Sequence, residues 1–501
     1  MRRPLVAVLA VGLVASCSSG GDDDDRTPPA PPPAVAPGAI EERECPDADQ
    51  LPDTAVCSWV VVPENRDEPD GAEVRLAVVE LYSTAPEPPN DVVVYLHGGP
   101  GGDATGSTSN WADDPILETR NVVLFDQRGS GLSEPALDCP EVDADILARF
   151  TAAGSYDDER ASRADAWAAC RERLVADGID LDAYDSEAIA DDLESLRLIL
   201  GVEQWNLFGV SYGTRIALTY MREYPEHVRT ALLDSVVAPA VGGVSYFVEN
   251  GNSGIEQLVE GCLADTACAA AYPDFATAVD RAYEQLNAEP FTGEVDLGGE
   301  AGVVTVVVDG SDALAGLFAA LYDYELIPLL PTVVEAIAAG DYSALPAIAQ
   351  EGIAEATGFS DGATISVLCA DSMPTFAEED DAIIGAPGRN ASLVIEVFDA
   401  YCDLWDVEPV GDGFHDPVTV DVPTMVVAGR YDPITPPAGG EAVAAALPNA
   451  GYAEWDGMSH GVLFSDAPCS AQQWLTWLAD PTVPPDLACA ADAVPPAFVA
   501  G

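Results

Sequence analysis

Short runs of apolar residues recur along the chain, and longer amphipathic stretches separate them. The runs are three to five residues long and lie at 92–96, 122–125, 205–208, 231–233 and 424–428. Continuous apolar character at this length is typical of strands that are buried on both faces of a parallel sheet. The stretch 74–82 mixes alternation with β-branched residues, which predicts a further, early strand.

The amphipathic stretches predict helices between these strands. The clearest covers 186–200, where isoleucine and leucine recur at three- and four-residue spacing and Gly201 follows the last of them. Strand and helix in repetition imply an open α/β sheet, mostly parallel and doubly wound, whose ligands lie beyond the carboxyl ends of the strands. The segment 240–412 breaks this rhythm, because it is rich in alanine and mostly helical in pattern. We interpret it as a cap inserted between core segments 45–239 and 413–501.

The first 17 residues are typical of an export signal. Two arginines precede a short apolar run at 5–14, and small residues lead to Cys17. Residues 14–17 resemble a bacterial lipobox, in which the cysteine becomes the lipid-modified first residue of the mature protein; an ordinary cleaved signal is the alternative. We therefore expect a cell-envelope lipoprotein on the outer face of the cytoplasmic membrane, with the membrane as a partner through Cys17, or a protein released outside the cell.

The segment that follows the signal is poor in apolar residues. Serine, glycine, aspartate and proline dominate it, so it cannot bury enough surface to fold. We expect residues 18–44 to form a flexible tether, with the folded part beginning near Cys45.

Ten cysteines remain after Cys17, and an even number in an exported chain argues for disulfides. The connectivity cannot be deduced from one sequence, but neighbours in the chain suggest the pairs Cys45–Cys57, Cys139–Cys170, Cys262–Cys268, Cys369–Cys402 and Cys469–Cys489. The competing reading is a metal site. The chain has no Cys-x-x-Cys motif and four histidines, so zinc ligation is not expected. We predict neither a metal nor a cofactor.

The chain is strongly acidic. Its formal net charge is -66, from 86 acidic residues against 20 basic ones, all of which are arginines. This argues against a nucleic acid as partner, because phosphates would be repelled over most of such a surface. High salt screens self-repulsion of this kind, so salt tolerance is one hypothesis for the composition, and a genome that disfavours lysine codons is the other.

Candidate chemistry first appears where the strand 205–208 meets a predicted helix. The residues 209–213 read Gly-Val-Ser-Tyr-Gly, which is the G-x-S-x-G motif in its required context of strand, tight turn and helix. Small flanking residues permit strained geometry at the central Ser211 and expose its hydroxyl at the sheet edge. The helix N-terminus behind it favours developing negative charge. Ser211 is therefore the candidate nucleophile.

A serine nucleophile needs a base, and the base needs an orienting acid. Among the four histidines, His460 lies late in the chain after an extended segment, and it is the candidate base; the alternative is a histidine in a surface loop. In this arrangement the acid follows a strand between serine and histidine. Asp432 comes after the strand 424–428 and is the candidate acid. Asp456, four residues before the histidine, is the reserve candidate.

The reaction also needs donors for the oxyanion. The loop 97–101 reads His-Gly-Gly-Pro-Gly and directly follows the strand 92–96, where it can turn backbone N–H groups toward the reacting carbon. We assign the N–H groups of Gly99 and Tyr212 to this role. A phosphate-binding loop is the alternative, but the Lys-Ser/Thr ending of such loops is missing.

These motifs together resemble the signatures of the α/β-hydrolase peptidases that include proline iminopeptidases and the exported tripeptidyl aminopeptidases of actinobacteria. The residues that carry the resemblance are 97–101 (HGGPG), 125–133 (FDQRGSGLS), 209–213 (GVSYG), 429–436 (GRYDPITP) and 459–461 (SHG). They span most of the chain from about Cys45 to Cys489. The resemblance implies an α/β-hydrolase fold with a largely helical cap, and the triad Ser211, Asp432 and His460.

The resemblance also implies an activity. Such enzymes are serine exopeptidases that release short peptides or single residues from the N-terminus of a peptide substrate, through an acyl-enzyme and without a cofactor. Their caps supply carboxylates for the substrate ammonium group. Glu249, Glu256 and Asp371 are candidates, and none of them can be aligned with the family. Two alternatives remain: a carboxylesterase or lipase with the same triad, and a surface-binding protein that kept the fold but lost activity. The oligomeric state is not predicted.

Overall fold

A computed structural model describes the chain from residue 38 to residue 499. Within this range it leaves out residues 46–50, 53, 153, 155, 241–242, 298–301, 373–400, 412, 466 and 468. The predicted signal peptide, its lipidation site Cys17 and most of the predicted tether lie outside the described residues.

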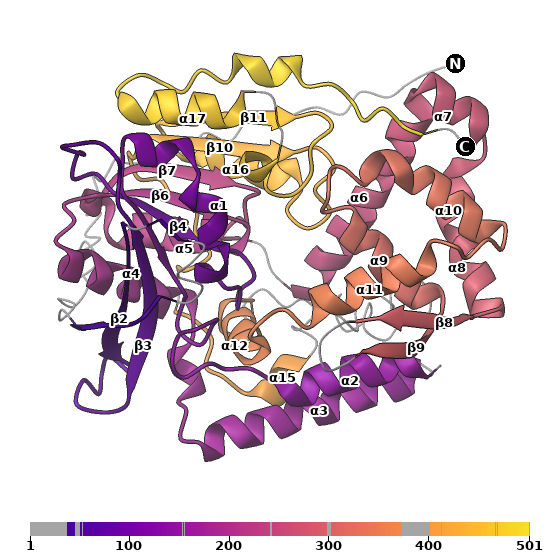
Figure 1. Cartoon of the computed structure of the whole chain (residues 1–501), viewed down its shortest axis with the longest axis horizontal. Helices are drawn as coiled ribbons and strands as arrows, with labels where there is room; N and C mark the ends of the chain where they lie inside the picture. Colours follow the sequence, from indigo (N-terminus) through magenta and orange to yellow (C-terminus); the bar gives the residue numbers. More distant parts are fainter. Residues whose placement is uncertain are drawn as a thin grey trace, which may run out of the picture. The chain divides into compact units, whose positions relative to one another are not determined.

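A nine-stranded sheet forms the centre of the core (Figure 1). Its strand order is β1-β2-β3-β5-β4-β6-β7-β10-β11. In this order, the neighbours from β1 to β5 pair antiparallel. The neighbours from β5 through β4 to β11 pair parallel. The strands are β1 (Ala39–Glu42), β2 (Ala55–Pro63), β3 (Glu73–Leu81), β4 (Val93–Leu96), β5 (Val122–Phe125), β6 (Trp205–Val210), β7 (Val228–Asp234), β10 (Thr424–Gly429) and β11 (Ala450–Trp455). The prediction of a mostly parallel α/β sheet is confirmed.

The N-terminal edge of the sheet differs from the expectation. Residues 39–42, which we expected in the tether, form β1 and pair along β2. Ile40 is half exposed, so burial contributes little to this strand. Backbone hydrogen bonds to β2 and an ion pair between Glu41 and Arg75 of β3 hold it instead. Neither backbone hydrogen bonds nor an exposed ion pair requires an apolar pattern in the sequence. The strand could therefore not be predicted from such a pattern.

Helices cover both faces of the sheet. On one face α4 and α5 share an apolar cluster with the strands, and on the other face α1 and α17 bring Trp111, Trp474 and Trp477 onto the sheet. The core helices are α1 (Thr108–Ala112), α2 (Pro140–Thr151), α3 (Tyr156–Ala176), α4 (Ser186–Leu200), α5 (Tyr212–Glu223), α16 (Pro437–Ala446) and α17 (Ser470–Ala479). Within the described part of the chain, no helix is long and apolar enough to span a membrane.

The inserted segment has an apolar cluster of its own, which includes Leu258, Phe275 and Ile327. Its elements are α6 (Gly243–Ala264), α7 (Thr266–Ala271), α8 (Ala278–Ala288), β8 (Phe291–Asp296), β9 (Val303–Val308), α9 (Gly310–Ala320), α10 (Leu330–Ala338), α11 (Leu345–Ala356), α12 (Asp361–Ser372) and α15 (Cys402–Trp405). Two of them depart from the expected cap boundary. α12 and α15 bury Ile365 and Trp405 in the core cluster, because α15 packs on α3 and α12 packs on α15.

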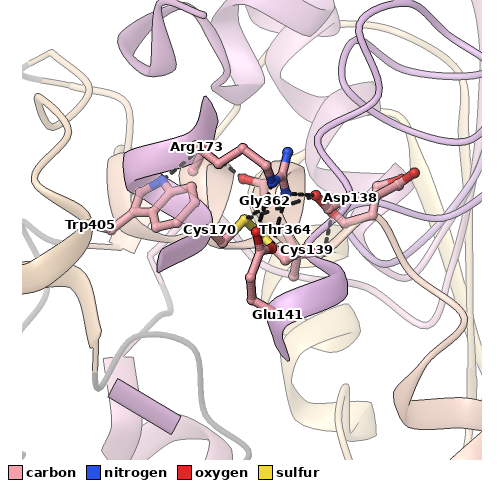
Figure 2. The surroundings of a disulfide bond; sticks show 10 residues. Asp138, Cys139, Glu141, Cys170, Arg173, Gly362, Thr364 and Trp405 are labelled. Carbon is pink, nitrogen blue, oxygen red and sulfur yellow. Dashed lines mark hydrogen bonds and ion pairs between the residues drawn. A yellow bond between two sulfur atoms is a disulfide. The ribbon is translucent and has the colours of Figure 1, made fainter. Parts of the chain in front are cut away.

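Five disulfides tie these elements together, and they join the pairs that neighbouring positions suggested: Cys45–Cys57, Cys139–Cys170, Cys262–Cys268, Cys369–Cys402 and Cys469–Cys489. Figure 2 shows one of them, Cys139–Cys170, which fixes the start of α2 to α3. Disulfides in this number indicate that the protein folds in an oxidising compartment outside the cytoplasm.

Candidate active site

The turn between β6 and α5 holds the candidate nucleophile. Ser211 has φ 57° and ψ -128°, a conformation that a residue other than glycine adopts only under strain. A side chain at Gly213 would collide with the carbonyl oxygen of Leu96, so the helix can approach β4 only with glycine at this position. The Ser211 N–H donates to the carbonyl of Asp234 at 3.0 Å. The turn therefore stores strain while its hydroxyl remains on a cavity wall.

The candidate acid and base lie together. Asp432, in the turn after β10, is buried and accepts hydrogen bonds from His460 Nδ1 at 2.8 Å and from the Thr435 hydroxyl and N–H at 2.7 and 2.8 Å. Burial acts to raise the pKa of Asp432, but the imidazole of His460 and the Thr435 donors outweigh it and lower that pKa. An ionised Asp432 keeps the proton of the neutral imidazole on Nδ1, which leaves Nε2 to accept one.

The loop after His460 is anchored by the end of β7. Asp234 accepts the N–H groups of Val462 and Leu463 at 3.0 and 2.8 Å, and the Ser235 hydroxyl accepts the N–H of Gly461 at 2.9 Å. Asp234 is fully buried, and burial raises its pKa to about 6. We did not predict this residue, although its place directly after the strand 231–233 was a usable signal.

The glycine loop after β4 runs beside the nucleophile. A Cβ atom on Gly98 would lie 2.8 Å from the Ser211 Cβ, and Gly99 has φ +117°, which suits glycine alone. Burial lowers the pKa of His97, which favours its neutral form. Gly99, Ser211 and His460 line the same cavity, and Tyr212 is the first residue of α5. Gly99 therefore shares a cavity wall with Ser211, and the role of the Gly99 and Tyr212 N–H groups as oxyanion donors stays a prediction.

The reserve acid is elsewhere. Asp456 lies 3.7 Å from Arg430 in a partly exposed ion pair and does not line the cavity. Asp432 is therefore the carboxylate that holds His460 in the described structure.

The cavity has a volume of about 580 Å³, within the range of small-molecule sites. We call the wall formed by Gly98, Gly99, Ser211 and His460 the sheet side. Aromatic and aliphatic side chains make up much of the remaining wall, among them Phe150, Phe247, Phe318, Phe359, Ile434 and Phe464. Such a lining suits a ligand with an apolar body.

Charged residues line the cavity where helices α2, α3 and α9 meet it. This wall, the helix side, consists of Arg149, Glu159, Arg163 and Asp312. In Figure 1 these helices lie well away from β4 and β6. Burial, followed by the neighbouring carboxylate of Asp309, raises the pKa of Asp312 to about 7, while Arg149 opposes the rise. The helix side therefore contributes Asp312, whose pKa lies near neutrality, to the cavity that Ser211 and His460 also line.

The cap carboxylates that the sequence suggested do not form this wall. Glu249, Glu256 and Asp371 are not among the lining residues, and Asp371 is completely buried. The carboxylates that line the cavity are Glu159 and Asp312 on the helix side and Asp361 of α12, and no sequence motif marks any of them. Among the described residues, no cluster of three or more His, Cys, Asp or Glu side chains could hold a metal ion.

Two family models match the chain. The alpha/beta hydrolase fold matches residues 91–251, which include Ser211. The model of a TAP-like protein matches residues 391–489, which include Asp432 and His460. Together the two ranges cover more than half of the 501 residues.

Several curated proteins are similar over part or most of their length. The serine protease Hip1 of Mycobacterium tuberculosis is 27% identical over 467 residues, which cover 87% of each chain. The tripeptidyl aminopeptidase of Streptomyces lividans is 31% identical over 223 residues, 42% of this chain and 41% of the relative. The proline iminopeptidase of Xylella fastidiosa is 28% identical over 172 residues, 34% of this chain and 41% of the relative.

Proposed function

We propose that this chain is a serine exopeptidase. The premise is that it belongs to the α/β-hydrolase group that includes tripeptidyl aminopeptidases and proline iminopeptidases, and that it is a serine hydrolase. Its substrates are peptides with a free N-terminus, from which it releases short peptides, tripeptides above all, or single residues. The observation that carries the proposal is that Ser211 and His460 share one cavity with the half-buried carboxyl groups of Glu159 and Asp312 on the helix side.

The sheet side supplies the chemistry. Ser211 Oγ attacks the scissile carbonyl while His460 Nε2 takes its proton, and the N–H groups of Gly99 and Tyr212 bind the oxyanion. The tetrahedral intermediate collapses, the leaving amine takes the proton from His460, and the N-terminal fragment remains esterified to Ser211. Water then attacks this acyl-enzyme with His460 again as base, which releases the fragment as an acid and restores the hydroxyl.

The helix side supplies the recognition. We assign the substrate ammonium group to Asp312 and Glu159, because carboxylates in a largely apolar cavity attract a cation more strongly than they would in water. The apolar wall between them and Ser211 receives the first side chains of the substrate. An acetylated N-terminus has no charge and would leave Asp312 without this partner.

Three substrates read out by absorbance test the proposal: a tripeptidyl anilide with a free amine, the same anilide acetylated at its N-terminus, and a short-chain ester. We expect cleavage of the free anilide at least tenfold faster, as kcat/KM, than of the acetylated one, since a hydrogen bond to a charged group contributes about 1.5–3 kcal/mol. Cleavage of the ester alone would overturn the exopeptidase assignment.

A carboxylesterase is the second candidate, and the apolar cavity lining favours it. The same three substrates separate the two, because an esterase would not distinguish the free anilide from the acetylated one. A catalytically silent binding protein would fail to react with a fluorophosphonate probe at Ser211 in a folded sample.

We also propose that the protein is attached to the outer face of the cytoplasmic membrane through a lipid on Cys17, or released from there. Metabolic labelling with an alkyne fatty acid should mark the wild-type protein and leave Cys17→Ala unlabelled. Equal labelling of both proteins would rule out this anchor.

A further inference from the structure

One helix contacts the loop that carries the first oxyanion donor. Thr364 of α12 donates its hydroxyl to the carbonyl oxygen of Pro100 at 2.8 Å, and the N–H of Ser360, the residue before α12, donates to the carbonyl of Gly101 at 3.0 Å. These carbonyls belong to the two residues after Gly99. Both hydrogen bonds come from α12 and the residue before it, so they restrain the loop directly after Gly99.

The other end of the same helix holds the second donor residue. Asp371 accepts the hydroxyl of Ser186 at 2.6 Å, and the Ser186 oxygen is 2.7 Å from the hydroxyl of Tyr212. Arg215 lies 3.6 Å from the same carboxylate, so two residues of α5 converge on Asp371. All four side chains are buried. The Tyr212 side chain is thus held through its hydroxyl group. Its backbone N–H is the first of α5 and directly follows Ser211 in the chain.

α12 is itself well anchored. The disulfide Cys369–Cys402 joins it to α15, and Ser360 donates to the Asp138 carboxylate at 2.7 Å. Figure 2 shows Gly362 and Thr364 next to the Cys139–Cys170 disulfide, which lies beside Asp138. The helix therefore reaches both oxyanion segments from a position that two disulfides stabilise.

We propose that α12 positions both halves of the oxyanion hole, Thr364 through the loop that carries Gly99 and Asp371 through Ser186 and Tyr212. The inference rests on the proposed function, because the two donors belong to it. Thr364 and Asp371 are positioning residues, since each acts on the reacting atoms through another residue. They should affect the transition state, in which the oxyanion forms, more than substrate binding.

The test compares Thr364→Val and Asp371→Asn with Ser366→Ala, a matched control. Ser366 is a completely buried hydroxyl on the same helix, bonded to Gly362 and Trp405 and to neither oxyanion segment. A short-chain ester serves as substrate, so the result does not depend on whether the enzyme prefers a free amine. The readouts are kcat, KM and the affinity for a boronic acid that forms a tetrahedral adduct with Ser211.

We expect Thr364→Val and Asp371→Asn each to lower kcat by about 10- to 100-fold, less than loss of a whole oxyanion donor, with KM changed by less than about twofold. Boronate affinity should fall with kcat. Thr364→Ser, which keeps the hydroxyl, should restore most of the rate, and Ser366→Ala should match wild type. If Asp371→Asn does not fold, Tyr212→Phe removes the same tether and leaves the backbone N–H in place.

The inference is overturned if the folded variants keep kcat within about twofold of Ser366→Ala, or if kcat falls while boronate affinity stays unchanged. Failure of the proposed function gives a different result. If the wild-type enzyme cleaves the ester but does not prefer the anilide with a free amine, the exopeptidase assignment is refuted. The comparison of kcat among the α12 variants, measured with the ester, is unaffected by that result.

Discussion

The two sides of the cavity are built in different ways. On the sheet side, Ser211 and the loop of Gly99 each follow directly after a strand, and His460 is held by Asp432 from the turn after β10, so the sheet fixes their relative positions. On the helix side, Arg149, Glu159 and Asp312 come from three helices that form no common sheet or turn. The comparison teaches that the chemistry depends on a rigid, local arrangement, whereas recognition depends on helix surfaces that can change in sequence without disturbing the triad.

Loss of the nucleophile should have the largest effect. Ser211→Ala should lower kcat by about 10⁵-fold or more for every substrate, because no other group supplies the attacking oxygen. It should leave the affinity for a free-amine peptide within about twofold of wild type, as measured by calorimetry, because the helix side is unchanged. Residual turnover above about 1% in a purified sample would contradict the assignment of Ser211.

The acid ranks next. Asp432→Asn should lower kcat by about 10⁴-fold, because an amide favours the wrong imidazole tautomer on His460. Asp456→Asn is the matched control, since Asp456 pairs with Arg430 away from the cavity, and it should keep kcat within about twofold of wild type. Steady-state assays with the ester compare the two. If kcat fell further in Asp456→Asn than in Asp432→Asn, Asp456 would be the acid that orients His460 and Asp432 would not.

A change on the helix side should act on one class of substrate alone. Asp312→Asn should raise KM for the free-amine anilide by about 10- to 100-fold, through the loss of one charge-assisted contact of about 1.5–3 kcal/mol. Hydrolysis of the short-chain ester should change by less than about twofold. Glu249→Gln, which alters a carboxylate that does not line the cavity, is the control and should leave both substrates unaffected. Equal losses on both substrates would place Asp312 in the chemistry or in the fold.

The smallest expected effect is a pH dependence of KM. Burial and Asp309 raise the pKa of Asp312 to about 7, so this carboxyl is mostly protonated at pH 6 and gains its charge as the pH rises. KM for the free-amine anilide should therefore fall by about three- to tenfold from pH 5.5 to 7.0, below the pKa of about 7.7–8.0 at which the substrate amine itself loses its proton. In Asp312→Asn this slope should disappear. A slope of the same size in the variant would assign the titration to another group.

The same contrast explains what could be predicted from the sequence. The motif at Ser211 is local, and strain and glycine packing at one turn determine it, so five residues and their flanks suffice. Asp432 could be found from its place after a strand. Asp234 follows the same rule, but nothing in the sequence indicates that a carboxylate anchors the loop after His460.

Long-range packing could not be read in this way. Asp371 was a candidate for the substrate ammonium group because it lies in the inserted segment, yet the direction in which α12 packs buries it behind Tyr212. Glu159 and Asp312 are 153 positions apart, and in a chain with 86 acidic residues neither stands out. Their meeting in one cavity depends on how α3 packs on α2 and α9 on α11, which no local pattern encodes.

The central claim is that the helix side selects the amino terminus of the peptide that the sheet side cleaves. Mass spectrometry of the products from one defined decapeptide, supplied with a free and with an acetylated N-terminus, tests it most directly. We expect short fragments to leave in sequence from the free amino end, and the acetylated peptide to stay intact. Cleavage at internal bonds, or equal cleavage of both peptides, would contradict the claim.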